Sequence, residues 1–288
     1  MTAGLEQFMA VRPRLFGIAY RMLGSASEAE DVLQDVWLRW QDYDHGSVES
    51  PAAFLATVTT RLSINAATSA RARHESYIGP WLPEPVNTSD DPALGAERGE
   101  ALGFAMLLLL EKLSPTERAA YVLREAFDYP YEQIALIVQL KEPATRQLVS
   151  RARKKLATER RVPVVATEQR RLLAAFLQAA QSGDVTALEE LFALDVVSYS
   201  DGNGAKLAAR IPVNGRSRVA KFIAAFASHF WVGKTIDWVE LNGQHAVTLT
   251  ENGTVTTALS MTVGDDGIQQ VLWMMNPAKL SRVTSEVA

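Results

Sequence analysis

Hydrophobic residues recur every three or four positions through the first 160 residues, a spacing that predicts amphipathic helices. Leu5, Phe8 and Leu15 begin the first such face, and Gly24 ends that helix. A Ser-x-x-Glu capping box at Ser27 predicts the start of the next helix, and a second one at Ser114 is followed by a proline, which suits a first helical position. The further helices are expected at about 28–41, 51–73, 100–112, 115–127, 131–138 and 143–158.

The pattern changes beyond residue 165, where helices give way to alternating strands. Two Asn-Gly pairs, at 242–243 and 252–253, and an Asp-Asp-Gly at 265–267 separate apolar runs and predict hairpin turns. This order predicts an α+β domain, with helices on one face of a curved antiparallel sheet. The expected elements are helices at 167–182, 185–193 and 216–230, and strands at 196–200, 235–241, 244–250, 254–263 and 268–275.

Two proline-containing segments divide the chain. The segment 75–100 holds four prolines and six acidic residues against one base, which is typical of an extended linker, and Pro163 marks a second linker. We therefore expect a multidomain protein: two all-α helical domains, the second a helix-turn-helix, followed by an α+β domain. The predicted boundaries are a helical domain 1–74, a linker 75–100, a helix-turn-helix domain 101–160 and an α+β domain 165–288.

Composition excludes several kinds of site. The chain has no cysteine, so a disulfide framework, a thiolate nucleophile and a cysteine-based zinc site are excluded, and a reducing cytoplasm is the expected location. The four histidines, His45, His74, His229 and His245, lack the spacing of a metal site, and we expect neither metal nor cofactor. No apolar run approaches the ~20 residues of a membrane span, and the N-terminus lacks the order of a signal peptide.

A net charge of −4 taken alone argues against a nucleic-acid binder, but the charge is distributed unevenly. Eight bases and two acids lie within 141–161, next to two helices at 131–138 and 143–158 with helix-turn-helix proportions. A solvated basic helix end is the alternative, which the preceding short helix and turn disfavour. The side chains expected on the exposed, DNA-facing side of the second helix are Thr145, Arg146, Gln147, Ser150, Arg151, Arg153 and Lys154.

These features together resemble a known family. The stretch SEAEDVLQDVWLRW, a third helix with a basic end, the acidic tether and the helix-turn-helix resemble the extracytoplasmic-function sigma factors of bacteria. The segment GPWLPEPV at 79–86 resembles the linker of the subgroup whose chain continues into a SnoaL-like (NTF2-like) domain, and residues 165–288 match that domain's element order. The resemblance covers nearly the whole chain and implies a protein that performs no chemistry itself.

The resemblance implies a role for each helical element. The second helix would dock on core RNA polymerase, and the 143–156 helix would read the −35 promoter element. The third helix would read and help to melt the −10 element, with 42–51 as the loop that holds a flipped base, although Ala66 and Thr68 stand where the family commonly has basic residues. The candidate polymerase contacts are Asp31, Gln34, Asp35 and Leu38, and the candidate −10 contacts are Arg61, Asn65, Arg71 and Arg73.

The resemblance also implies that the C-terminal domain regulates the attached sigma unit, so that no separate anti-sigma protein is needed. Residues 201–206, DGNGAK, resemble an Asp-Gly-Gly-Gly-Lys loop, and 276–280, NPAKL, resemble an Asn-Pro-Asp-Lys-Leu tail with alanine in place of its acid. The acidic tether could imitate nucleic acid in the RNA channel of polymerase, or serve as a plain linker. The candidate regulatory residues are Trp81, Leu82, Pro83, Glu84, Pro85, Asp201, Gly202, Gly204, Lys206, Asn276, Pro277 and Lys279.

Two other functions remain open from the residues. An NTF2-like cone can be an isomerase or cyclase, here fused to a DNA-binding regulator, with Asp201, His229, Asp237 or His245 as the candidate base. A ligand-responsive repressor that uses only the helix-turn-helix is the third possibility, and an unknown small ligand in the cone is compatible with each. The preferred prediction is a sigma factor that binds core RNA polymerase and promoter DNA.

Overall fold

The computed structural model describes residues 2–74, 77–88, 103–157, 165–205, 207–281 and 283. These residues form two compact units. The first contains 2–74 and 103–157, and the second contains 77–88 together with the described residues from 165 onwards. Residues 77–88, which lie in the expected linker, therefore belong to the C-terminal unit.

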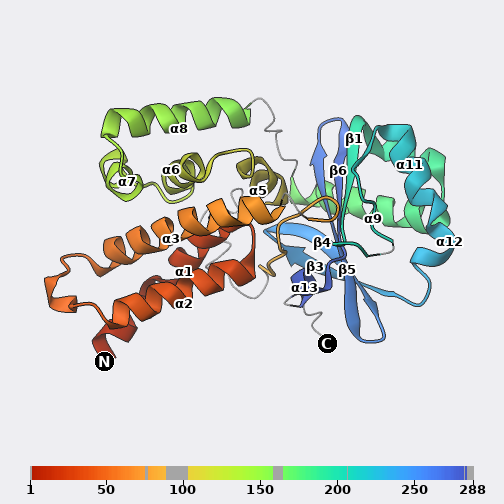
Figure 1. Cartoon of the computed structure of the whole chain (residues 1–288). Helices are drawn as coiled ribbons and strands as arrows, with labels where there is room; N and C mark the ends of the chain where they lie inside the picture. Colours follow the sequence, from red (N-terminus) through yellow and green to blue (C-terminus); the bar gives the residue numbers. More distant parts are fainter. Residues whose placement is uncertain are drawn as a thin grey trace. The chain divides into compact units, whose positions relative to one another are not determined.

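The first unit is entirely helical (Figure 1). Its helices begin and end where local signals favour it: Gly24, at φ +64°, follows α1, and Pro51 is the first residue of α3. Ser25 rather than Ser27 caps α2, because its hydroxyl accepts the Glu28 N–H at 3.2 Å. The elements are α1 (Thr2–Leu23), α2 (Ala26–Gln41), a 3-10 turn η1 (His45–Ser47), α3 (Pro51–His74), α5 (Phe104–Leu110), α6 (Pro115–Glu125), α7 (Tyr131–Val138) and α8 (Glu142–Ala157).

The first three helices pack on one another, and α6 supports the helix-turn-helix. Trp40 is fully buried and its indole N–H donates to the Gly4 carbonyl at 2.9 Å, which ties α2 to the start of α1. Ser114 and Glu117 form the capping box expected at the start of α6. Glu117 accepts the Ser114 backbone N–H, which lowers the pKa of that carboxyl.

The second unit is a six-stranded mixed sheet in the order β2-β1-β6-β5-β4-β3, with helices packed on one face. The elements are α9 (Ala166–Ser182), α10 (Val185–Leu191), β1 (Phe192–Asp201), β2 (Val213–Asn214), α11 (Arg216–Ala225), α12 (Ala227–Phe230), β3 (Thr235–Leu241), β4 (Gln244–Glu251), β5 (Thr254–Gly264), β6 (Gly267–Met274) and α13 (Pro277–Leu280).

The expectation of an antiparallel sheet is right for β3 to β6 and for β1 with β2, and wrong for β1 with β6. Asn242 and Asn252 adopt positive φ ahead of their glycines, and the tight turns they form require antiparallel neighbours. No hairpin joins β1 to β6, and these two strands pair in parallel. The expected helix at 216–230 is also interrupted, because α11 ends at Ala225 and α12 begins at Ala227.

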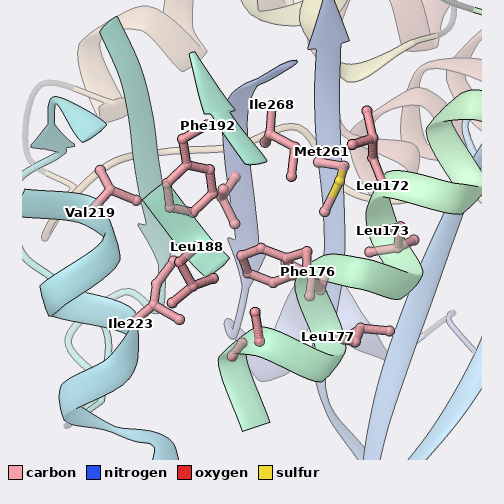
Figure 2. Packing of buried hydrophobic residues seen from close by; sticks show 14 of the residues in the cluster. Leu172, Leu173, Phe176, Leu177, Leu188, Phe192, Val219, Ile223, Met261 and Ile268 are labelled. Atoms are coloured by element: carbon pink, nitrogen blue, oxygen red, sulfur yellow. The ribbon is translucent and has the colours of Figure 1, made fainter. Parts of the chain in front are cut away.

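The core of the second unit lies between the sheet and α9, α10 and α11 (Figure 2). Phe176 of α9 stands at its centre, with ring centroids 6.1 Å from Phe192 and 6.0 Å from Trp273. Leu188 and Ile223 close it from α10 and α11. Because side chains alternate along a strand, the neighbours of the core residues face the opposite side of the sheet.

Candidate functional site

The basic helix α8 presents most of its expected DNA-facing side chains to solvent. Gln147, Ser150, Arg151 and Lys154 are exposed, while Leu148, Val149, Ala152 and Leu156 form its buried face. Thr145 departs from the expectation: it is fully buried, and its hydroxyl donates to the Lys141 carbonyl at 3.2 Å. The spacing places Thr145 on that face, three residues before Leu148 and four before Val149, so the expectation followed its polar side chain rather than its position.

Two arginines of α8 are held by neighbouring groups. Arg146 pairs with Glu142 at 2.5 Å and lies 4.5 Å from the centroid of the Tyr131 ring. Arg153 pairs with Glu125 of α6 at 2.6 Å, and this hydrogen bond raises the pKa of the guanidinium. These exposed contacts orient the side chains and contribute little to stability, since surface ion pairs of this kind are worth about 0–1 kcal/mol.

On α3, Arg61 is engaged within the first unit. Its Nε donates to the Ile137 carbonyl at 3.1 Å and its Nη2 to the Leu136 carbonyl at 2.9 Å, both at the end of α7. Asn65 is exposed one turn further along. The side chains of Arg71 and Arg73 lie outside the described residues.

The 42–51 loop carries a small aromatic cluster. Tyr43 is 47% exposed, and its ring centroid lies 4.5 Å from that of Phe54. His45 stacks near Trp40, with centroids 4.2 Å apart, and its Nε2 lies 2.7 Å from the Trp40 carbonyl oxygen. The loop therefore presents an aromatic surface supported from behind by α2 and α3.

Asp31, Gln34, Asp35 and Leu38 share the exposed face of α2. The opposite face buries Val32, Leu33 and Val36 against the helical core. This is the polar stripe with an apolar edge that the three- and four-residue spacing predicts.

Residues 77–88, which we call the strap, are bound along the second unit. At one end the buried carboxylate of Asp201, the last residue of β1, is the centre of the contacts. It accepts hydrogen bonds from the Tyr77 hydroxyl and, at 2.8 Å, from the Leu82 N–H. It also pairs with Lys279 at 2.6 Å. A single carboxylate thus joins the strap to both motif segments of the C-terminal domain, 201–206 and 276–280.

Lys279 and Asn276 complete this anchor. The Lys279 ammonium donates to the Leu82 carbonyl and lies 4.3 Å from the Trp81 ring centroid and 5.2 Å from that of Tyr77. The Asn276 amide donates to the Tyr77 oxygen at 2.8 Å. Burial, followed by the hydrogen bond to Asp201, raises the pKa of Tyr77 far above its ordinary value.

The far end of the strap adds a short strand-like contact to the end of β3. The Asn242 N–H donates to the Val86 carbonyl at 2.9 Å, and the Thr88 N–H donates to the Glu240 carbonyl at 3.1 Å. These two bonds flank the facing pair Asn87 and Leu241. The Asn242 side chain also accepts the Val86 N–H at 3.0 Å.

Within the strap, Leu82, Pro83, Glu84 and Pro85 are buried and Trp81 is half-buried. Only Glu84, of the six acids of the expected tether, falls in the described residues, and it is 2% exposed. The described part of the tether is therefore a docked segment rather than a solvated acidic chain. The sequence analysis did not predict the contacts of Tyr77 and Asn242 with other residues of this unit. Asn242 was identified only as part of an expected Asn-Gly hairpin turn.

The two motif segments, 201–206 and 276–280, have different local structures. A Cβ at Gly202 would lie 2.4 Å from that of Ala208, and Gly204 has φ +91°, so both positions require glycine. Asn276 caps α13 by accepting the Ala278 N–H at 3.1 Å, and Pro277 is exposed at its first position. Lys206 lies outside the described residues.

The four candidate catalytic bases are not assembled into a site. His229 is exposed on α12, while Asp237 on β3 and His245 on β4 are half-buried. Asp201 is committed to the strap. Among the described residues, no group of three His, Asp or Glu side chains could hold a metal ion, and no helix is both long and apolar enough to span a membrane.

Comparison with known proteins assigns the helices of the first unit to two known sigma-factor regions. The model of sigma-70 region 2 matches residues 7–73, and that of sigma-70 region 4 matches residues 104–156. The ECF RNA polymerase sigma factor SigJ of Mycobacterium tuberculosis (strain H37Rv) is 34% identical over 237 residues, covering 80% of this chain and 75% of SigJ. This chain belongs to the ECF sigma factors. Such factors bind core RNA polymerase and direct it to promoters, and they are not enzymes.

Other ECF sigma factors are similar over nearly the full length. The probable ECF sigma factor SigI of M. tuberculosis is 29% identical over 282 residues, covering 96% of this chain and 95% of SigI. The crystal structure of the extracytoplasmic function sigma factor SigJ of M. tuberculosis superposes with a TM-score of 0.77 at 29% identity, covering 96% of this chain and 98% of that one. The likeness includes the C-terminal α+β domain as well as the two sigma regions.

Proposed function

We propose that this ECF sigma factor contacts promoter DNA through α8 and α3, contacts core RNA polymerase through α2, and is modulated by its own C-terminal domain through the strap. The first three roles rest on exposed faces of the right chemistry. The modulation rests on the docking of a segment that lies, in the chain, between the two sigma regions.

For the −35 element, α8 offers Arg146, Gln147 and Arg151 along its exposed side. Arginine and glutamine are side-chain types that read base edges in the major groove, and Ser150, Arg153 and Lys154 suit phosphate contacts. Arg146 is paired with Glu142 on the exposed side of α8, and a base edge or a phosphate can replace this partner.

For the −10 element, Asn65 and the aromatic surface of the 42–51 loop are the available contacts. An extruded base needs a stacking surface, and Tyr43 offers a half-exposed ring held from behind by Phe54. Arg61 would join them only after it releases the α7 carbonyls.

The strap supplies a physical means of modulation. Regions 2 and 4 must both engage polymerase and promoter, so the tether that joins them has to reach between their sites. Docking withholds the twelve residues 77–88 from that tether, and twelve extended residues span about 40 Å. A docked strap therefore restricts the reach of the two regions, and a released strap restores it.

The single observation that carries this proposal is the buried Asp201, which accepts hydrogen bonds from two strap residues and pairs with Lys279 of the C-terminal tail. Replacing it tests the proposal. With Asp201→Asn, the Lys279 ammonium loses its charge partner, so the strap should release more often and run-off transcription with purified core enzyme should rise.

Asp237→Asn is the matched control, since Asp237 is a half-buried carboxylate on β3 outside these contacts. We expect it to leave transcription unchanged. Unaltered output from the Asp201→Asn protein, with its fold intact by circular dichroism, would refute modulation through the strap.

A further inference from the structure

The strap lies on the side of the sheet opposite the core. Thr248 of β4 faces this side, because it alternates with the core residues Val247 and Leu249. Residues that pair across neighbouring strands share a face, so the register assigns the other side chains as well. Two rows result on the strap side: Asp201, Met274, Ala258 and Thr248 in one, and Tyr199, Leu272 and Ser260 in the next.

The strap crosses these rows between two points of attachment. Leu82 donates its N–H to Asp201 on β1, and Asn87 faces Leu241 on the edge strand β3. The strands β6, β5 and β4 lie between β1 and β3 in the sheet, so the strap passes over them. Helix α13 shares this side of the sheet, since its Lys279 pairs with Asp201.

Two hydroxyls are buried on the strap side without a hydrogen-bond partner. Thr248 of β4 and Ser260 of β5 are both fully buried. Within the part of the chain that the structure describes, neither hydroxyl oxygen makes a hydrogen bond. Such a hydroxyl has lost its water and gained no replacement, which destabilises the covered state. Once the strap leaves, water can reach both hydroxyls and this penalty is removed.

The core face of the same strands has a different composition. Its side chains on β4, β5 and β6 are mostly large and apolar, and they include Val247, Leu249, Leu259, Met261, Val271 and Trp273. The strap side combines Met274 and Leu272 with an alanine and the two hydroxyls, so docking of the strap buries less apolar area there. The core face therefore suits permanent burial, and the strap side suits a cover that can leave.

We propose that Thr248 and Ser260 set the docking equilibrium of the strap. Their unpaired hydroxyls raise the free energy of the docked state relative to the released state, and so keep docking reversible while the rest of the unit stays folded. The inference rests on the modulation proposed above only for its effect on transcription, because the effect on docking is measured separately.

Thr248→Val in the full chain tests the inference. Valine keeps the branched shape of threonine and replaces the hydroxyl with a methyl group, which favours burial. The readout is hydrogen exchange of the strap N–H groups that docking protects, those of Leu82, Val86 and Thr88. Their exchange should slow roughly fivefold or more, the effect of removing one unpaired buried hydroxyl. Ser260→Ala should act in the same direction.

Thr257→Val is the matched control. Thr257 is also fully buried, and its hydroxyl has no hydrogen-bond partner among the described residues. It pairs with Leu249 and therefore lies on the core face of the sheet. The same substitution should leave exchange in the strap unchanged, although both valine variants should raise the urea midpoint of unfolding.

Three results of the exchange experiment would overturn the proposal. Unchanged exchange in Thr248→Val would mean that the buried hydroxyl does not oppose docking. Faster exchange would mean that the hydroxyl has a bound water as its partner under the strap. Equal slowing by Thr257→Val would mean that the strap opens only when the whole unit unfolds.

Run-off transcription separates this inference from the modulation. Tighter docking in Thr248→Val should lower the output with core enzyme, the opposite of the Asp201→Asn effect, and Thr257→Val should leave it unchanged. If exchange in the strap slows and output stays the same, the hydroxyls set docking and the proposed modulation fails. If exchange does not slow, the inference fails whatever Asp201→Asn does to transcription.

Discussion

At the scale of single residues, Tyr77 links the docking of the strap to pH. Its pKa is raised because the hydroxyl is partly buried and donates to a carboxylate. An undocked tyrosine ionises near pH 10, whereas the docked one keeps its proton. The docked state therefore binds more protons above that pH, so its stability is complete below about pH 10 and falls as the pH rises further.

Substitution of Tyr77 tests this linkage. Urea unfolding followed by circular dichroism should show a midpoint that falls between about pH 9 and about pH 11. Tyr77→Phe should weaken that fall, and Tyr43→Phe, at an exposed ring in the first unit, should leave it as in the natural protein. An equal pH dependence in both variants would show that Tyr77 ionises as it does in the unfolded chain.

Several residues show why part of the site could not be read from the sequence. The Tyr77 and Val86 contacts join positions 124 and 156 residues apart, and no local pattern indicates such pairs. Conversely, Asp201, Asn276 and Lys279 lie in motifs that the sequence already marked, and the structure brings them together at the strap. Thr145 was misplaced because its polar side chain was weighed above its spacing, which puts it on the same helix face as Leu148 and Ala152.

At the scale of elements, α8 carries the prediction on promoter recognition. Changing Arg146 and Arg151 together to alanine should lower promoter-dependent run-off transcription about 10-fold or more, since one lost DNA contact costs about 1–3 kcal/mol. The affinity for core polymerase should not change, because both side chains lie on the exposed face of α8, whereas the proposed polymerase contacts are on α2.

The control for α8 is Arg171→Ala, an exposed arginine of α9 that pairs with Glu168. It should leave transcription and core binding as in the natural protein. Loss of core binding together with transcription in the α8 variant would mean that this helix serves the assembly of the factor rather than the reading of DNA.

The sequence predicted the pairing of some strands but not of others. The Asn-Gly pairs fixed three consecutive antiparallel strands, because a two-residue turn leaves no other pairing. The parallel partner of β1 lies across a long connection, and alternation along a strand indicates its faces without its neighbour or direction. The strap was expected as a tether because prolines and acids resemble a linker until its apolar residues are seen buried.

At the scale of the whole molecule, near-neutral charge agrees with the hypothesis that this factor reads DNA only together with polymerase. The net charge is −4, although the α8 region is locally basic. On this hypothesis, weak general attraction to phosphates would keep nonspecific DNA binding low, and promoter contact would depend on both regions being positioned at once. Under the proposed modulation, control over the reach of the tether is control over promoter use.

A disulfide lock on the strap tests this claim most directly. The natural chain has no cysteine, so an Asn87→Cys, Leu241→Cys protein has a single possible pairing. These residues face each other across the strap and β3 between two backbone hydrogen bonds, a position compatible with disulfide geometry. The Asn87→Cys single variant is the control for oxidation itself.

The measurement is run-off transcription by core polymerase with the oxidised and the reduced forms of the double variant. The reduced protein should direct promoter-dependent transcription, and the oxidised one should give about fivefold less or lower still, the size of a typical coupling between sites. Reduction should restore the output, and the single variant should not respond. Equal transcription from the locked and unlocked forms would contradict control by the strap.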